Sequence, residues 1–226
     1  MPIGTFINAV AIIFGGLIGA KFHEFIPKKV QHIVFQGIGL TVLLIGLQMA
    51  LKVENILTLL FSILLGGVIG EIFNLETRLE HFGLFLKSKF KSHDPKFTEG
   101  FVVNTMFACI GAFAILGPIN EGLRGDRTIL ITKSIIDFFT ALAFASSLGI
   151  GVAFSSIPIL IYQGSIFLLA SLIQGVFTPF ILTQLTAVGG LLIVGIGINL
   201  LEIKKIKITN LLPSLLFIIL FSLFFK

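Results

Sequence analysis

One carboxylate lies inside a stretch that is otherwise apolar enough to cross a membrane. Asp137 belongs to the segment 133–151, KSIIDFFTALAFASSLGIG, in which Lys133 is the other charged residue. An ionised carboxylate held away from water is costly unless it is paired, hydrated or neutralised. Transporters hold their coupling ions in helix interiors of this kind. We therefore predict that Asp137 binds a cation or a proton.

A structural role for Asp137 stays open at this point. Lys133 precedes it by four residues, and side chains at this spacing meet on one face of a helix. If the helix begins near residue 131, Asp137 lies about 9 Å from its start, six residues at a rise of about 1.5 Å. In that case Lys133 neutralises the carboxylate as an ion pair, with no role in transport.

Other polar side chains within the predicted spans are candidates for the same ion or substrate pathway. Each of them could instead hydrogen-bond a neighbouring helix, as polar side chains commonly do in lipid. Thr140 follows Asp137 by about one turn, so it gives this face of the helix a hydroxyl group. The candidates besides Asp137 are Asn8, Gln48, Glu71, Asn104, Thr140, Gln163 and Asn199.

The composition indicates a multi-pass membrane protein. Of the 226 residues, 56% are hydrophobic and 12% are charged, whereas a soluble domain has about a quarter of its residues charged. The mean hydropathy is +1.08. We predict an all-α fold, a polytopic transmembrane helical bundle that forms a single integral membrane domain over 1–226. About eight spans are expected, at 3–20, 33–51, 56–73, 101–118, 131–154, 157–176, 183–201 and 210–225.

Basic residues predict the orientation of these spans. Eleven Lys and Arg fall on the side of the loops that follow odd-numbered spans, and five fall on the other side. Because cytoplasmic loops are enriched in Lys and Arg, both termini are predicted to lie on the outer, non-cytoplasmic side of the cell's inner membrane. Segment 75–99 has apolar residues at helical spacing opposite charged ones, which predicts a cytosolic amphipathic helix on the bilayer surface. The basic charge is thus explained by the lipid bilayer, and no nucleic-acid partner is expected.

The fourth predicted span is the least regular. Gly111, Gly117 and Pro118 weaken its helical hydrogen bonding, and freed backbone carbonyls at membrane depth must face protein or a water-lined cavity. The sequence is consistent with a broken helix beside a pathway. Ordinary termination of the helix at Pro118 is the alternative.

The sequence favours no enzyme class. It contains no Ser–His–Asp, paired-carboxylate or HExxH arrangement within the spans, and its four histidines share no metal-ligand spacing. One cysteine excludes an internal disulfide. We expect no cofactor and no bound metal other than a sodium ion, with a proton as the alternative. Small-residue faces leave a homo-oligomer open.

Two parts of the chain resemble each other. A shift of 151 residues lays 39–51 on 190–202, with Gly39 on Gly190 and Gly46 on Gly197. One further residue of shift lays part of 59–64 on 211–216. By the predicted topology these copies are inverted, as in many secondary transporters. The sequence is therefore consistent with an inverted repeat of spans 1–3 and 6–8.

Five stretches of the chain resemble a known family. Segments 4–19, 64–71, 108–126, 132–165 and 187–216, among them GTFINAVAIIFGGLIG and TKSIIDFFTALAFASSLGIG, are similar to the YqgA/YdfK-like bacterial multi-pass membrane proteins, a family of unknown function. The resemblance implies a prokaryotic inner-membrane protein with a suspected transport role. It also implies that Asp137 of TKSIID is the intramembrane carboxylate of the family.

The leading hypothesis is an ion- or proton-coupled secondary transporter of a small solute or ion. A passive channel is one alternative, although it would need a continuous polar stripe where the sequence has isolated polar residues. A lipid-binding or assembly scaffold is the other, with Asp137 in a structural ion pair.

Overall fold

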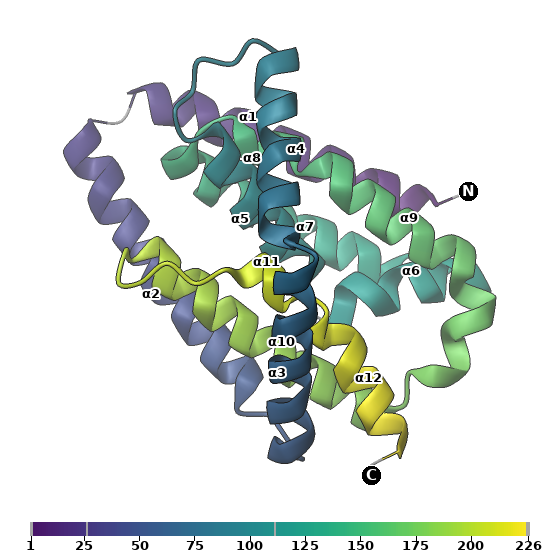
Figure 1. Ribbon diagram of the computed structural model, residues 1–226. Coiled ribbons are helices and arrows are strands. Elements are labelled where there is room, and N and C mark those ends of the chain that lie inside the picture. Colours follow the sequence, from purple (N-terminus) through teal and green to yellow (C-terminus); the bar gives the residue numbers. More distant parts are fainter. Residues whose placement is uncertain (1, 26, 111, 225–226) are drawn as a thin grey trace. The chain divides into compact units, whose positions relative to one another are not determined.

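Helices joined by short connections make up the chain (Figure 1). The computed structural model describes residues 2–25, 27–110 and 112–224, and no β-strand occurs in that part. The prediction of an all-α fold is therefore confirmed. The helices are α1 (Ile3–Phe25), α2 (Lys28–Ala50), α3 (Ile56–Ile72), α4 (Leu75–Lys89), α5 (Phe97–Cys109), α6 (Ala112–Arg124), α7 (Thr128–Leu148), α8 (Gly151–Phe154), α9 (Ser156–Ile173), the 3-10 turn η1 (Gln174–Val176), α10 (Pro179–Leu200), α11 (Ile208–Leu211) and α12 (Ser214–Phe224).

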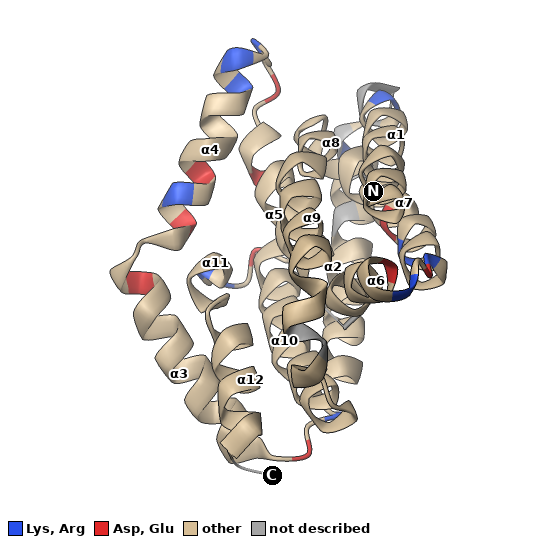
Figure 2. Cartoon of the chain, turned by 90° about the vertical axis from the view of Figure 1, so that its right-hand side faces the viewer, with Lys and Arg blue, Asp and Glu red and all other residues tan. Residues whose placement is uncertain are grey.

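Several helices are long and apolar enough to cross a membrane. Within the described ranges there are five such spans, and seven if two bent helix pairs each count as one span. The last predicted span, 210–225, corresponds to the shorter apolar stretch Ile208–Phe224. Figure 2 shows α9, α10 and α12 without a charged residue, whereas charges mark α4 and the loops. This distribution is that of a polytopic membrane protein.

The chain divides into two compact units that alternate along the sequence. Unit 1 comprises Met1–Phe35, Glu80–Cys109 and Phe113–Leu172, and unit 2 comprises Gln36–Leu79, Ile110–Ala112 and Ile173–Lys226. Unit 1 thus contains α1 and α5 to α9, and unit 2 contains α3 and α10 to α12. The prediction of a single integral domain stays a prediction.

In unit 1, α1 and α7 run parallel along a seam of small residues. A Cβ atom on Gly15 would collide with the carbonyl oxygen of Phe138, and one on Gly19 would collide with that of Leu142. Ala145 provides a small side chain opposite Gly19. Helices in lipid associate through such close backbone contact, since no hydrophobic force drives them together. The seam fixes the register of α1 on α7.

In unit 2, α3 packs antiparallel against the C-terminal helices. Gly66 lies against the backbone of Ser214 in α12, and Gly70 lies against that of Asn210 in α11. Asn55 begins α3 by accepting hydrogen bonds from the backbone N–H groups at Leu57 and Thr58, at 3.1 and 3.2 Å. This is the N-cap interaction that satisfies otherwise unpaired groups of a first turn.

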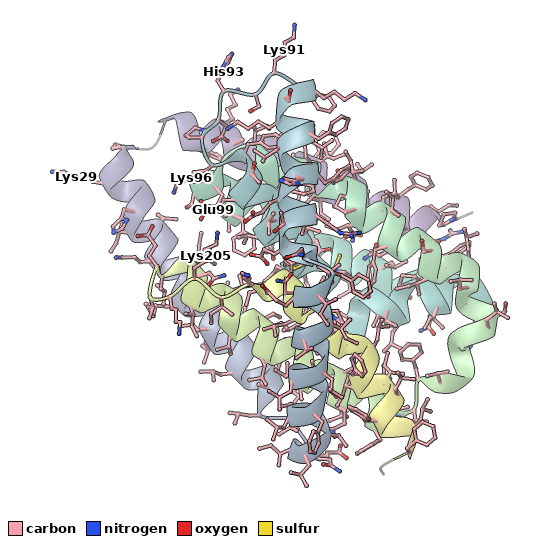
Figure 3. All side chains as sticks on the ribbon, in the orientation of Figure 1. Lys29, Lys91, His93, Lys96, Glu99 and Lys205 are labelled. Atoms are coloured by element: carbon pink, nitrogen blue, oxygen red, sulfur yellow. The ribbon has the colours of Figure 1, made fainter. Side chains whose placement is uncertain are left out.

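The connection between α7 and α8 depends on one glycine. Gly149 has φ +75°, and the carboxylate of Asp94 lies where its side chain would be. The same carboxylate accepts hydrogen bonds from the backbone N–H groups of Ile150 and Lys96, at 3.0 and 2.9 Å. In the basic loop that carries Asp94, Figure 3 shows Lys91 and His93 pointing away from the ribbon. The surface position predicted for the segment 75–99 stays a prediction.

The fourth predicted span is broken, as one of the two alternatives predicted, but it does not end at Pro118; a pathway beside the break stays a prediction. Pro118 lies inside α6, which continues to Arg124, so the helix does not terminate at Pro118. Gly117 also lies within α6, where it packs against Leu130 of α7. The bend of 60° instead separates α5 from α6. Gly111 lies outside the described residues.

Candidate functional site

The charged residues of α7 form a buried ion pair. The ammonium of Lys133 donates to both carboxylate oxygens of Asp137, at 2.8 Å to Oδ1 and 2.7 Å to Oδ2. The side chains are 7% and 4% exposed. Taking two charges out of water is costly, so a pair of this kind persists only with close contact between the charges. The geometry satisfies this condition.

The pair lies near the middle of α7. Asp137 is nine residues beyond Thr128, so it is about 14 Å from the start of the helix at a rise of about 1.5 Å per residue. This is deeper than the estimate drawn from the sequence, because α7 begins three residues earlier than predicted.

Two of the predicted polar residues meet between α1 and α9. The amide nitrogen of Asn8 donates to Oε1 of Gln163 at 3.2 Å, and both side chains are fully buried. The other halves of these amides, Asn8 Oδ1 and Gln163 Nε2, have no hydrogen-bond partner within the described residues. A buried polar atom without a partner costs about 1–3 kcal/mol, so this amide pair leaves one acceptor, on Asn8, and one donor, on Gln163, that a polar ligand would stabilise.

A second buried carboxylate, which the sequence did not suggest, lies at the start of α1. Glu121 in the last turn of α6 accepts from the backbone N–H of Gly4 at 2.8 Å and from Nε of Arg127 at 2.9 Å. Both bonds go to Oε1, whereas Oε2 is buried without a partner among the described residues. The signal that could have found it is helical spacing, since Glu121 follows the buried residues Ala114 and Pro118 at intervals of four and three.

The other candidates in unit 1 do not join the ion pair. Asn104 of α5 donates to the hydroxyl of Ser155 at 2.6 Å and is buried. Thr140 donates to the carbonyl of Ile136 in its own helix, at 2.8 Å. Its hydroxyl therefore satisfies the α7 backbone and does not supply a ligand to Asp137.

Three candidates belong to unit 2. Gln48 is exposed on α2. Asn199 closes the loop after α10 through two hydrogen bonds with the backbone of Ile206, at 2.8 and 2.7 Å. Glu71, at the end of α3, accepts from Lys207 at 2.5 Å and from Asn210 at 2.6 Å. Asn199 and Glu71 thus stabilise loops and helix ends.

The titratable groups provide no metal centre in the described part of the chain. No three His, Cys, Asp or Glu residues there are grouped closely enough to hold a metal ion. A pocket of about 380 Å³ in unit 2 is lined mainly by apolar groups, among them Leu57 and Phe61. Among the described residues, the buried charged side chains are Glu121, Lys133 and Asp137, and all three belong to unit 1.

The fold is all-helical in the described residues, with several helices of membrane-spanning length and a buried ion pair. These features define a polytopic helical membrane protein. The chain belongs to the DUF554 family, since the family model described as "Protein of unknown function (DUF554)" matches residues 3–223. The resemblance noted from its motifs is confirmed. No solved structure gives a significant match.

Two bacterial relatives are similar over nearly their full length. "Uncharacterized protein YqgA" of Escherichia coli (strain K12) is 38% identical over 221 residues, which cover 96% of this chain and 94% of that protein. "Uncharacterized membrane protein YdfK" of Bacillus subtilis (strain 168) is 36% identical over 217 residues, covering 94% and 92% respectively. The name of the second relative agrees with the membrane location indicated by the helices.

Proposed function

We propose that the protein is a secondary transporter coupled to a proton or a sodium ion, and that Asp137 binds this cation. The observation that carries the proposal is the Lys133–Asp137 pair, which is buried at mid-height in a helix of membrane-spanning length. Intramembrane carboxylates of this kind mark ion pathways and proton relays. The transported species is a small solute or ion.

The pair supplies a mechanism for coupling. Both oxygens of Asp137 accept from Lys133, so a cation that binds Asp137 must displace the ammonium group. Removing one partner of a buried pair costs about 3–5 kcal/mol, and the incoming cation must supply a comparable free energy. The lysine-bound and cation-bound forms are then two separate states. Transport follows if these states favour different access to the two sides of the membrane.

Contacts within unit 2 support an inverted repeat, which is common among secondary transporters. If a two-fold axis relates residues that differ by 151, every contact between the copies has a counterpart with the partners exchanged. Gly46 of α2 lies against Val194 of α10, and Gly197 of α10 lies against Leu43 of α2. These contacts exchange under the shift of 151, because Gly46 corresponds to Gly197 and Leu43 to Val194.

A second pair of contacts obeys the same rule. Gly39 lies against Leu201, and Gly190 lies against Ala50. Gly39 corresponds to Gly190, and Ala50 to Leu201, so this pair also exchanges under the shift. The repeat we propose covers α2 and α3 against α10 to α12, which is narrower than spans 1–3 and 6–8.

The scaffold alternative has one observation in its favour. Lys133 and Asp137 sit four residues apart on one helix, the arrangement expected of a purely structural pair. The buried atoms of Asn8 and Gln163 without partners favour the transporter, since a structural core satisfies its polar groups.

The experiment is ion flux into proteoliposomes that contain the full chain, under imposed sodium or proton gradients. Radiolabelled sodium and a pH dye trapped in the lumen are the probes. We expect gradient-driven flux in the wild type, its loss in Asp137→Asn, and its retention in Asp126→Asn, an exposed carboxylate outside the helices. Gradient-driven flux that does not saturate with cation concentration would identify a channel. Absence of flux in the wild type, with Asp137→Asn normally folded, would overturn the proposal.

A further inference from the structure

Buried polar atoms without partners gather at the start of α1. Seven such atoms occur among the described residues, and four of them belong to α1 or to the two unit 1 helices that hydrogen-bond with it. These four are Thr5 Oγ1, Asn8 Oδ1, Glu121 Oε2 and Gln163 Nε2. Native structures leave few buried polar groups unpaired, so a concentration of them in one place indicates a ligand.

Glu121 provides the charge at this place. Its side chain is 2% exposed, yet Oε2 has no donor among the residues that the structure describes. The partner of Oε1, Arg127, is 41% exposed and therefore keeps much of its hydration. A buried carboxylate oxygen without a donor is a site that a cation or a proton stabilises.

Helix geometry lines up the remaining oxygens with Glu121. Glu121 Oε2 lies 3.1 Å from the position that a Cβ on Gly4 would occupy, and Asn8 is four residues beyond Gly4, on the same face of α1. Thr5 and Asn8 are three residues apart, so their Cβ atoms lie about 5–6 Å from each other on one helix face. Both are fully buried. The oxygens thus follow one another along α1, away from its N-terminus.

Because α1 and α7 run parallel, the oxygens of Glu121, Thr5 and Asn8 follow α1 in the direction of the Lys133–Asp137 pair. Gly4 packs against Leu130, and Gly15 packs against Phe138, so α1 and α7 run parallel and stay in contact along this length. Asp137 is seven residues beyond Leu130, which is about 10 Å further along α7. Asn8 therefore lies at a level between Glu121 and Asp137.

We propose that Glu121, Thr5 and Asn8 form a second cation site, through which the coupling ion reaches Asp137 from the side of the membrane where α1 begins. All three groups offer an oxygen with a free lone pair, the ligand type that sodium and protons bind. Gln163 positions the site, because its Oε1 engages the nitrogen of Asn8 and leaves the oxygen of Asn8 open. This inference rests on the proposed function and names the route of the cation.

Thiol accessibility tests the site without a transport assay. In full-length protein in liposomes, with Cys109→Ser as background, Thr5→Cys and Asn8→Cys are treated with N-ethylmaleimide. The matched control is Leu130→Cys, a fully buried position at the level of Gly4 with an apolar side chain. Modification is read after denaturation as a gel shift with a polyethylene glycol maleimide.

We expect the two α1 positions to react at least about tenfold faster than Leu130→Cys, because N-ethylmaleimide attacks hydrated thiolates and buried thiols are inert. Equal, slow modification at all three buried positions would overturn the second site, whatever the flux assay gives.

Transport kinetics give an independent readout. Glu121→Gln keeps an acceptor for Gly4 but removes the charge, and loss of a charge-assisted contact should raise the half-saturating sodium or proton concentration about tenfold. The control is Asp126→Asn, which should leave it unchanged. Wild-type kinetics in Glu121→Gln, with flux still abolished by Asp137→Asn, would remove the second site and leave the transporter. If Thr5→Cys and Asn8→Cys react fast but the wild-type protein shows no flux, the transporter proposal would be rejected and the polar site at the start of α1 would be kept.

Discussion

Lys133 and Asp137 bond to each other at both carboxylate oxygens while nine-tenths or more of each side chain is removed from solvent. The protein is destabilised more when one member of such a pair is replaced than when both are replaced by apolar residues. A single substitution leaves an unpaired charge in the protein interior. This asymmetry separates the contribution of the pair to folding from its contribution to transport.

We predict that Lys133→Met and Asp137→Asn each lower the free energy of unfolding by about 3–5 kcal/mol, and that Lys133→Met/Asp137→Leu recovers most of this loss. Thermal unfolding in detergent measures the stability. The double variant should remain without cation-driven flux, since its carboxylate is absent. Flux in a stable double variant would contradict the assignment of Asp137.

The seam between α1 and α7 should be intolerant of added side chains. Gly19→Ala would force its Cβ into the carbonyl of Leu142, and overpacking of this kind costs about 1–3 kcal/mol. The matched control is Gly164→Ala in α9 of the same unit, where no atom lies within 4 Å of an added Cβ. We expect a lower melting temperature for the first variant and an unchanged one for the second. Equal melting temperatures would show that the seam does not hold the two helices.

The sequence predicted those features whose partners lie on one helix. Lys133 and Asp137 are four residues apart, so their contact followed from helical spacing alone. The bond between Asn8 and Gln163 spans 155 residues, and that between Gly4 and Glu121 spans 117. Such pairs depend on which helices become neighbours. The apolar pattern of a membrane span does not encode this, because its lipid-facing and protein-facing sides are both apolar.

Glu121 and Pro118 illustrate the same limit. Glu121 stands in the charged stretch NEGLRGD, whose composition is typical of a solvated loop, whereas α6 extends through it to Arg124. Pro118 suggested the end of a helix because it lacks an N–H group. A proline can remain inside a membrane helix when neighbouring groups satisfy the freed carbonyl. Local rules therefore misplaced a helix end and concealed a buried carboxylate.

In unit 2, Gln184 should be a strong determinant of stability. Its Oε1 accepts from the backbone N–H groups of Glu54 and Asn55, at 2.9 and 3.3 Å, and its Nε2 donates to Asn55 O and Thr58 Oγ1, at 3.0 and 2.8 Å. Gln184→Leu leaves these groups unpaired, and we expect a loss of at least about 2 kcal/mol in unfolding free energy. Thr183→Val, a change at the neighbouring position, should cost little. Similar melting temperatures for the two variants would contradict this assignment.

Asp126 should make stability depend on pH in the acid range. The backbone N–H and then the hydroxyl of Thr128 donate to it, and these bonds lower its pKa below the ordinary value of 3.8. A carboxylate with a depressed pKa in the folded state stabilises the protein above 3.8 and ceases to do so as the pH falls through its folded pKa. The difference in melting temperature between wild type and Asp126→Asn should therefore shrink below that pH. A difference that stays constant with pH would contradict this linkage.

The proposed two-fold relation in unit 2 predicts paired cross-linking. Gly39 with Leu201 and Ala50 with Gly190 are contacts that exchange under the shift of 151 residues. Cysteines placed at either pair, in a Cys109→Ser background, should form a disulfide under mild oxidation, because a disulfide requires Cα atoms within about 7 Å. The control pair is Gly37→Cys with Leu201→Cys, since no atom lies within 4 Å of a Cβ added at Gly37. If the two copies are related by an axis, both test pairs should cross-link at similar rates and the control should not. Cross-linking of one test pair alone would mean that the two halves of unit 2 pack differently, and the inverted repeat would then lose its support.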